Sequence, residues 1–544
     1  MSEQDKTLKP ASTVSSETGL KTAKPTEFTD WQTSLDSARG GATLLDRILS
    51  PHDSATLVPK LSVDDLFGYI RRIGLQDAEG VLALASGTQV QGMLDTDGWS
   101  RDELQLERLD PWLNALMRAG PEVLGERILD LDDSMVTQLL LSSVKVYVID
   151  EPEDFNAPDV EHVLTPDGRL CICFPESAPR DLPIKIFLDW LVQMKPIYCM
   201  NLLVFSAAAL ESNLVEDAYR WRSARMADRG YVDYYDALKI YVPATKQQIA
   251  NLTAEQVSLG PVVRHWLAPL SSGSQRLEAA LSVVDSDALD HVQSSLAYAM
   301  NMALSADRVE LWDEEHQEES LQRVRSGLVL GLDAINGPDA SPEMDAQTLG
   351  SVPVSLIFRV GYGRVLDAAG AARSSSIVRN LRGESGRVGG VDIPHLRPWA
   401  EWLTARHPAM PGGDTPSTSG QLNEMTSNAV RLADLARVSG ADRDIDVGIA
   451  QLVLTRFVGA MLGLQSDGPL PLDQLVNAHA VLIEDGQVPD STRDAAYLWW
   501  LEQGGRQRET VDLLLGEVTE QLGGISQGAL EARHIPLLWI IEHS

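Results

Sequence analysis

The sequence contains few cysteines, and this limits the kinds of protein that it can encode. Only three occur in 544 residues, at Cys171, Cys173 and Cys199, so any pairing leaves one over. Such a set cannot form the disulfide framework of a small secreted protein, and the Cys-x-Cys pair lacks the second pair that a tetrahedral zinc site needs. We therefore expect reduced, mostly buried thiols in a cytoplasmic protein that binds no cofactor and has no metal site.

Basic residues are also scarce relative to acidic ones. The chain has 45 Lys and Arg against 78 Asp and Glu, which gives a net charge of −33. Sequence-independent binding of nucleic acids depends on basic residues that neutralise phosphates, and the same charge repulsion opposes an anionic membrane surface. We expect no nucleic-acid partner, whereas basic proteins and weakly bound divalent cations stay open as partners.

Long apolar runs are missing as well. The longest, residues 197–210, contains Asn201 and Ser206 and is too short to span a bilayer, so we expect no membrane insertion. Residues 1–26 lack the apolar segment of a signal peptide and are rich in Ser, Thr and Lys, which predicts a disordered tail. Residues 197–214 are instead expected to form a buried helix.

Sequence motifs of common enzyme classes are absent or incomplete. The chain has no phosphate-binding Gly-Lys-Ser/Thr loop and no His-Glu-x-x-His pair. Residues 361–364 (Gly-Tyr-Gly-Arg) begin like a dinucleotide loop but lack the third glycine, and residues 383–386 lack the spacing of a nucleophile elbow. Because a catalytic triad is assembled in space, a serine or cysteine nucleophile stays open, but nothing selects one.

Acidic residues stand three positions before a histidine at several places, a spacing found in di-metal carboxylate bundles. The pairs are Asp313/His316, Glu531/His534 and Asp159/His162. With 78 acidic residues and ten histidines, one or two such pairs are expected by chance. We therefore interpret the acidic run at residues 313–319 as a solvated helix face, with weak divalent-cation binding as the alternative.

What the sequence has in abundance is helical periodicity. Apolar residues recur at helical spacing from about residue 28, with Ser62 as an N-cap, Gly74 as a stop, Thr88 opening a third helix and Pro121 at a first helical position. Short helices of this kind cannot fold alone, which predicts a superhelical stack. We expect a mainly α protein, in which this stack is joined to a small embedded antiparallel β element and to further helical bundle domains.

Breaks in periodicity and composition divide the chain into six predicted parts. After the tail at 1–26, they are the short-helix domain (27–143), a part with the β element and the central block (144–245), a helical domain (246–410), a Pro/Gly/Ser/Thr-rich linker (411–420) and a C-terminal helical domain (421–544). Within the second of these, residues 144–149 alternate as in a strand, and residues 163–174 read as a hairpin around Pro166-Asp167-Gly168.

Arginine and aromatic residues are densest in the central block, residues 219–238. On a helix over residues 215–229, Arg222, Arg225 and Arg229 fall on one face. Tyr234 and Tyr235 follow on a second helix, capped by Asp233. This face can bind a phosphate or carboxylate ligand, which makes the three arginines and two tyrosines candidate ligand-binding residues, or it can form internal ion pairs while the aromatic residues build core.

The central block also carries a resemblance to a known family. Residues 219–243, YRWRSARMADRGYVDYYDALKIYVP, resemble a block in a family of large, soluble, uncharacterised bacterial proteins, a domain of unknown function. Residues 61–86, which begin LSVDDLFGYIRRIG, and residues 354–364, VSLIFRVGYGR, are also similar to segments of that family. The resemblance covers most of residues 40–410 and implies no known chemistry.

A second resemblance concerns the short helices alone. Residues 57–142, with LSVDDLFGYIRRIG followed by DAEGVLALASGTQVQGMLD, look like the superhelical intracellular N-domain of magnesium transporters. No transporter membrane segment follows, so the resemblance implies regulation by a divalent cation rather than transport.

Three functional hypotheses follow from the sequence. The leading one is a non-enzymatic helical scaffold or adaptor that presents concave surfaces to a protein partner, because helices stack, the charge is acidic and no catalytic constellation stands out. The second is a small-ligand-binding protein or enzyme that uses the Arg222/Arg225/Arg229 face. The third is a divalent-cation-responsive regulator.

Overall fold

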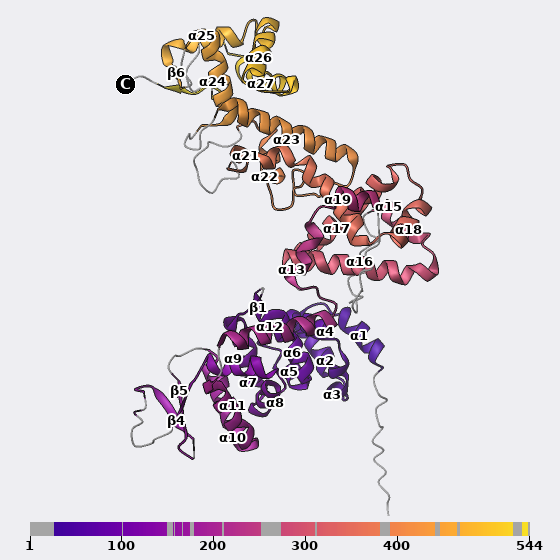
Figure 1. Cartoon of the computed structure of the whole chain (residues 1–544), viewed down its shortest axis with the longest axis vertical. Helices are drawn as coiled ribbons and strands as arrows, with labels where there is room; N and C mark the ends of the chain where they lie inside the picture. The colour runs from indigo at the N-terminus through magenta and orange to yellow at the C-terminus, as the bar shows by residue number, and fades with distance from the viewer. Residues whose placement is uncertain are drawn as a thin grey trace, which may run out of the picture. The chain divides into compact units, whose positions relative to one another are not determined.

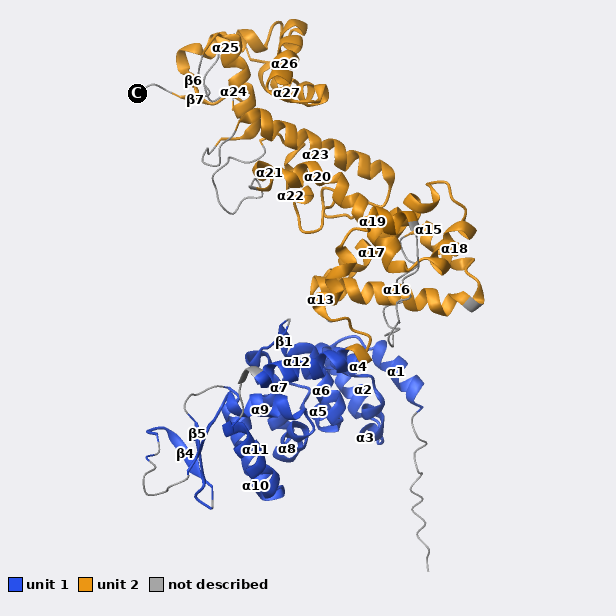
Figure 2. Ribbon diagram, in the orientation of Figure 1, with its two compact units in different colours: residues 1–226 blue, residues 227–544 orange. Residues whose placement is uncertain are grey.

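The protein forms two compact units, residues 1–226 and 227–544 (Figures 1 and 2). The computed structural model describes residues 27–541 except 101, 150–155, 157, 166, 175–178, 209–210, 252–273, 310–312, 381–391, 441–446, 465–467 and 526–535. The expected disordered tail therefore lies outside the described residues, as does the Glu531/His534 pair. Both units consist mainly of helices with small sheets, which confirms the predicted fold class.

The first unit begins with a series of short helices. They are α1 (Phe28–Asp36), α2 (Gly41–Leu49), α3 (Ser54–Leu57), α4 (Val63–Ile73), α5 (Glu79–Leu84), α6 (Gly87–Asp97), α7 (Leu106–Ala119), α8 (Pro121–Leu129) and α9 (Asp133–Leu141). A 3-10 turn (Val58–Lys60) follows α3, and two-residue strands β1 (Trp99–Ser100) and β2 (Glu103–Leu104) pair between α6 and α7.

Local capping chemistry sets the ends of these helices. The Ser62 side chain accepts a hydrogen bond from the backbone N–H of Asp65, and Gly74 ends α4 at a φ of 98°, where an L side chain would be strained. The helix expected to open at Thr88 begins at Gly87, because Ser86 makes a capping box with Gln89.

The interior of this stack is apolar and includes large aromatic residues. Phe67 on α4 and Trp112 on α7 are both buried, and their rings stack with centroids 5.8 Å apart. Helices α8 and α10 (Asp181–Met194) approach closely, since a Cβ built on Gly125 would lie 2.2 Å from the Trp190 ring. Such contacts bury the faces that the helical spacing of the sequence marks as apolar.

The predicted β element is present as a three-stranded antiparallel sheet. Its strands are β3 (Lys145–Val148), β4 (Glu161–Leu164) and β5 (Leu170–Phe174), in the order β3-β5-β4, with Val146 and Val163 both opposite Ile172. The central strand is the most buried, and the Cys171 and Cys173 sulfur atoms lie 3.5 Å apart on it. Burial raises the pKa of the Cys171 thiol to about 11, which keeps that thiol protonated at neutral pH.

Three helices close the first unit: α10, α11 (Pro196–Ala208) and α12 (Glu211–Asp228). The expectation of one buried helix over residues 197–214 is wrong in two respects. The helix ends at Ala208, and only one of its sides is buried: Ile197, Val204 and Phe205 are exposed, whereas Cys199 and Leu203 face the interior. When all sides of a helix are apolar, the sequence does not indicate which side packs against the rest of the unit.

The second unit contains the remaining helices and one further strand pair. Its elements are α13 (Tyr234–Ala237), the 3-10 turn η2 (Leu238–Tyr241), α14 (Lys246–Asn251), α15 (Gln275–Ser282), α16 (Ser286–Asp307), α17 (Glu314–Asn336), α18 (Pro342–Ser351), α19 (Val354–Ala368), α20 (Gly370–Ser374), α21 (Ser376–Asn380), α22 (Arg397–Leu403), α23 (Ser419–Ser439), α24 (Ile449–Met461), the 3-10 turn η4 (Leu472–Gln474), α25 (Leu475–Leu482), α26 (Asp490–Glu502) and α27 (Arg508–Leu522). Strands β6 (Leu470–Pro471) and β7 (Ile540–Ile541) pair in parallel.

Helices α17 and α19 pack backbone to backbone through glycines. A Cβ built on Gly361 would lie 1.9 Å from the carbonyl oxygen of Gly327, and one on Gly331 would lie 2.0 Å from that of Ile357. Any larger residue at these positions would force the two helices apart. This contact fixes the positions of the side chains that α17 and α19 carry.

One continuous apolar core joins α19–α23 to the C-terminal helices. It includes Val365 on α19, Trp399 on α22, Leu432 on α23, Phe457 on α24 and Leu515 on α27. The core therefore runs across the predicted linker at residues 411–420, which leads directly into the start of α23.

Candidate functional site

Two of the predicted site residues, Arg222 and Arg225, both hydrogen-bond to one buried residue on α6, Asp95. Arg225 donates from Nε to Asp95 Oδ2 at 2.6 Å and from Nη2 to Asp95 Oδ1 at 2.8 Å, and Nη2 also lies 3.0 Å from Asp132 Oδ2. Arg222 donates from Nε to the Asp95 carbonyl oxygen at 2.8 Å, and its guanidinium lies 5.2 Å from the centre of the Trp99 ring. Helix α12 is thereby tied to α6 and to the start of α9.

The electrostatics of this cluster favour full ionisation of the arginine. Burial opposes the charge of Arg225, but the hydrogen bonds and charges of Asp95 and Asp132 outweigh it and raise the pKa of Arg225. Burial in turn raises the pKa of Asp132, against the hydrogen bond from Met135 and the charge of Arg225. The Asp95 side chain has no exposed surface, so Arg225 supplies the counter-charge that its carboxylate requires.

The other predicted site residues, Arg229, Tyr234 and Tyr235, belong to the second unit. Arg229 stands one residue beyond the end of α12, with its guanidinium 5.2 Å from the centre of the Tyr231 ring. Tyr234 contacts Tyr235 edge-on and lies under the guanidinium of Arg308, at 4.5 Å. The structure thus brings Arg222 and Arg225 together and gives Arg225 an internal role. A ligand role for the Arg222/Arg225/Arg229 face stays a prediction.

Local structure explains one of the acidic-x-x-His pairs, Asp313/His316, as a helix cap. Asp313 caps α17 by accepting a hydrogen bond from the backbone N–H of His316, and its other oxygen lies 2.6 Å from His316 Nδ1. The His316 side chain is largely exposed and that of Asp313 is partly exposed. Across the described residues, no group of three or more His, Cys, Asp or Glu side chains is arranged to hold a metal ion.

A buried polar cluster that the sequence did not reveal lies in the second unit. We call it the Asp307 network, and it consists of Tyr241, Asp307, Arg323, Tyr362 and His407. Asp307 Oδ2 accepts from Tyr241 Oη at 2.7 Å and from Arg323 Nη1 at 2.5 Å, while Oδ1 lies 3.0 Å from His407 Nε2. His407 Nδ1 is 2.9 Å from Tyr362 Oη. The five residues come from η2, α16, α17, α19 and the segment after α22.

The protonation states of the network follow from its neighbours. Burial favours neutral Asp307, but the hydrogen bond from His407 and the charge of Arg323 outweigh it and hold the pKa of Asp307 at about 2. Burial lowers the pKa of His407 against its hydrogen bond to Asp307, so the imidazole is neutral at neutral pH. Burial raises the pKa of Tyr362 to about 12, so this phenol donates to Nδ1 and His407 carries its proton on Nε2.

The network joins two segments that resemble the same family. Tyr241 belongs to residues 219–243 and Tyr362 to residues 354–364, whereas Asp307 and His407 lie in neither. The sequence could therefore single out the two tyrosines, but only the tertiary structure shows that they meet at Asp307 and His407. The Asp307 side chain is 8% exposed and that of His407 15%, so the network is a buried polar contact that joins helices of the second unit.

The most conspicuous apolar surface of the first unit lies on α11. We call Ile197, Val204 and Phe205 the α11 apolar face; they are 79%, 48% and 53% exposed, and their spacing places them on one side of the helix. Val192 and Met194 at the end of α10 are also exposed. No helix in the described part of the chain is by itself both long and apolar enough to cross a membrane; α11 passes such a test only together with residues 213–228, across a bend of 117°.

Comparison with known proteins places the chain in a family. The sequence profile of a family of unknown function (DUF6178) matches residues 21–439, and the protein belongs to this family. No curated protein and no solved structure matches the sequence. The expectation of an uncharacterised family is thereby confirmed. The Asp307 network and the α11 apolar face lie inside the matched residues, whereas α24–α27 lie beyond them.

Proposed function

We propose that this protein is a non-enzymatic, cytoplasmic helical scaffold that binds a protein partner through the α11 apolar face. The observation that carries the proposal is the exposure of Ile197, Val204 and Phe205 along one side of a helix that contains no charged residue. Exposed apolar stripes at helical spacing are the form in which a helix docks into the groove of another protein.

The charge of the chain indicates what the partner surface looks like. A net charge of −33 repels anionic lipid headgroups and a second copy of the chain alike. Helix α11 is neutral, but Asp189 on the neighbouring α10 is exposed. The partner that fits is a different protein, with an apolar groove to receive the α11 apolar face and basic residues around the rim of that groove.

The test starts by identifying the partner at the face itself. A photo-crosslinking residue placed at position 205 in the full chain should capture one protein in native cells, and the same residue at Leu498, an apolar side chain 63% exposed on α26, should not. The captured protein is then purified, and its dissociation constant is measured with wild type, Ile197→Ser and Phe205→Ser.

We expect each serine variant to weaken binding about tenfold or more, since an apolar anchor in a groove carries about 2 kcal/mol. The matched Leu498→Ser variant should bind as wild type does. Equal capture at positions 205 and 498, or unchanged affinity in both α11 variants with an unchanged melting temperature, would refute the proposal. Crosslinking to a second copy would show that the face forms a homodimer instead.

The two other hypotheses stay predictions with their own tests. For the Arg222/Arg225/Arg229 face, Arg222→Ala should abolish any saturable phosphate or carboxylate binding seen by calorimetry. For the divalent-cation regulator, which rests on the resemblance of residues 57–142 to the transporter N-domain, titration with magnesium should give saturable heat. No specific contact in the structure favours either over the scaffold.

A further inference from the structure

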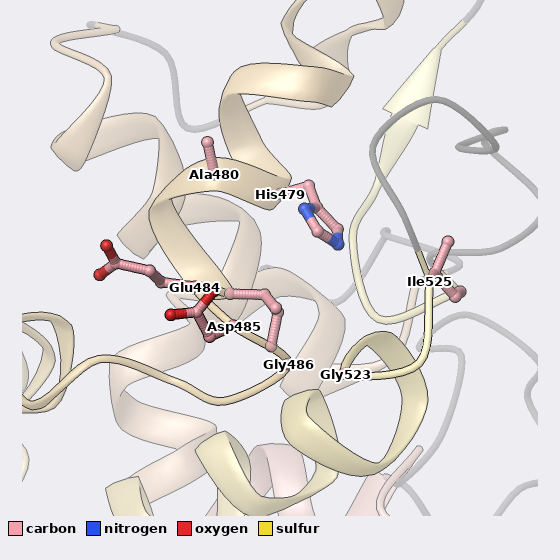
Figure 3. A pocket seen from close by; sticks show the side chains of 8 residues that line it. His479, Ala480, Glu484, Asp485, Gly486, Gly523 and Ile525 are labelled. Atoms are coloured by element: carbon pink, nitrogen blue, oxygen red, sulfur yellow. The ribbon is translucent and has the colours of Figure 1, made fainter.

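A pocket of about 530 Å³ lies where the ends of two C-terminal helices meet, in the second unit and outside the residues that match the family (Figure 3). It opens at the end of α25 and the end of α27, and its lining includes His479, Glu484, Asp485, Gly486, Gly523 and Ile525. The volume is within the range of sites that bind small molecules, roughly 300–1,000 Å³.

His479 is a buried polar side chain in the lining of this pocket that has no partner. It is 3% exposed, and neither Nδ1 nor Nε2 makes a hydrogen bond. In Figure 3 its ring projects from α25 on the side where Ile525 lies. Buried polar side chains are nearly always hydrogen-bonded, because an unmade hydrogen bond leaves the loss of hydration uncompensated. An imidazole that faces a cavity with both nitrogens unmatched indicates that the pocket holds a polar molecule.

Two glycines bring the chain into close contact at the rim of the pocket. A Cβ on Gly523 would lie 2.5 Å from the carbonyl oxygen of Gly486, and one on Gly486 would lie 2.9 Å from that of Gly523. Asp485 adopts a φ of 50°, an uncommon left-handed conformation for a residue with a side chain.

Acidic side chains supply the charge of the described lining. Glu484 and Asp485 contribute two carboxylates, and among the described residues no basic side chain other than His479 belongs to the lining. The last carbonyl groups of α25 and α27 add the negative ends of two helix dipoles. A bound anion would be repelled, and a cation would be stabilised.

We propose that this pocket binds a small organic cation that carries an amine or guanidinium group. The cationic group lies toward Glu484 and Asp485, and a second polar group of the same molecule hydrogen-bonds to His479. A bare metal ion fits less well, since the described residues contain no cluster of three ligating side chains and offer His479 as the sole imidazole of the lining. This site is independent of the α11 apolar face.

Calorimetry on the full chain tests the proposal with putrescine and agmatine as probes and 1,4-butanediol as the neutral counterpart of putrescine. We expect saturable one-to-one binding of at least one cation and none of the diol. Asp485→Asn keeps a residue that tolerates the left-handed conformation while it removes the charge, so it should weaken binding about tenfold, as should Glu484→Gln. Asp473→Asn, an exposed carboxylate outside the pocket, is the control.

A variant with His479→Gln should also weaken binding, and it separates the imidazole from the rim charges. If this variant does not fold, the two rim variants still decide, because both side chains are exposed. The proposal is overturned if neither cation binds, if Asp485→Asn binds as tightly as Asp473→Asn, or if magnesium chloride alone displaces the organic cation at equal concentration.

Discussion

Replacing Asp307 by asparagine removes one charge from the centre of the Asp307 network and keeps the shape of the side chain. In the wild type, the carboxylate accepts hydrogen bonds from Tyr241 and Ser320 and balances Arg323, whose side chain is only 14% exposed. The asparagine keeps one acceptor oxygen but leaves the guanidinium without its counter-charge inside the unit.

Two independent arguments set the expected magnitude. Removing one partner of a buried ion pair costs about 3–5 kcal/mol, because the remaining charge stays desolvated. The pKa of Asp307, about 2 against an ordinary 3.8, gives the stabilisation of the ionised form as about 2 kcal/mol. We therefore expect Asp307→Asn to lower the local free energy of unfolding by about 2–4 kcal/mol at pH 7.

The pH dependence has a definite sign. Because the folded-state pKa of Asp307 is depressed, its contribution is complete above the unfolded pKa of 3.8 and is lost as the pH falls toward 2. The difference in stability between wild type and Asp307→Asn should accordingly shrink at pH 3. A wild-type advantage that grows in acid would contradict the assignment of an ionised Asp307.

Amide hydrogen exchange measured by mass spectrometry gives the local readout that a chain with two units requires, since the two-state approximation holds for small single domains. Peptides from α16, α17 and α19 should lose protection in Asp307→Asn, while peptides from the first unit should not change. The matched control is Asp367→Asn on α19, an exposed carboxylate in the same unit. The reasoning fails if the two variants change protection equally, or if Asp307→Asn costs less than about 1 kcal/mol.

Three further predictions concern single contacts. Because burial lowers the pKa of His407 below 6.5, the wild type should lose stability relative to His407→Gln as the pH falls from 7.5 to 5.5. A constant difference between the urea unfolding midpoints of the two proteins over this pH range would contradict this prediction. Gly361→Ala should cost more than about 2 kcal/mol, whereas Gly350→Ala on α18, with open space around its Cβ, should be neutral or slightly stabilising by thermal melting. Arg225→Met should destabilise the first unit by about 3 kcal/mol, as measured by hydrogen exchange in peptides from α6. The control is Arg220→Met, which should cost less than about 0.5 kcal/mol because the Arg220 side chain is 68% exposed. Similar effects of the two substitutions would mean that Asp95 is not stabilised by the ion pair.

Helix existence was readable from the sequence because its signals are local. The apolar spacing of α4, its cap at Ser62 and its stop at Gly74 require nothing beyond neighbouring residues, and all are present in the structure. The strand pattern at residues 144–149 and the hairpin after it were readable for the same reason. Where a boundary was misplaced, as at Thr88, a neighbouring serine offered the same chemistry.

The candidate sites were readable only in part, because their geometry depends on distant segments. Arg222 and Arg225 were singled out by their spacing, but the residue to which both hydrogen-bond, Asp95, lies 127 and 130 positions away. Asp307 and His407 are 100 positions apart and belong to no motif. No sequence signal marks His479 either, since the local sequence of an apolar helix is the same whether its histidine is hydrogen-bonded or borders a cavity.

The sequence by itself determined the mainly α composition, the ends of most helices, the embedded hairpin and the strongly acidic charge, because each depends on residue type or on contacts within a few positions. Tertiary structure decided which side of each apolar helix is covered, and so turned α11 from an expected core helix into a surface. It also decided which polar groups meet: a salt bridge, the Asp307 network and an unpartnered imidazole arise from the way that packed helices bring distant residues within 3 Å or leave them apart, which no local pattern records.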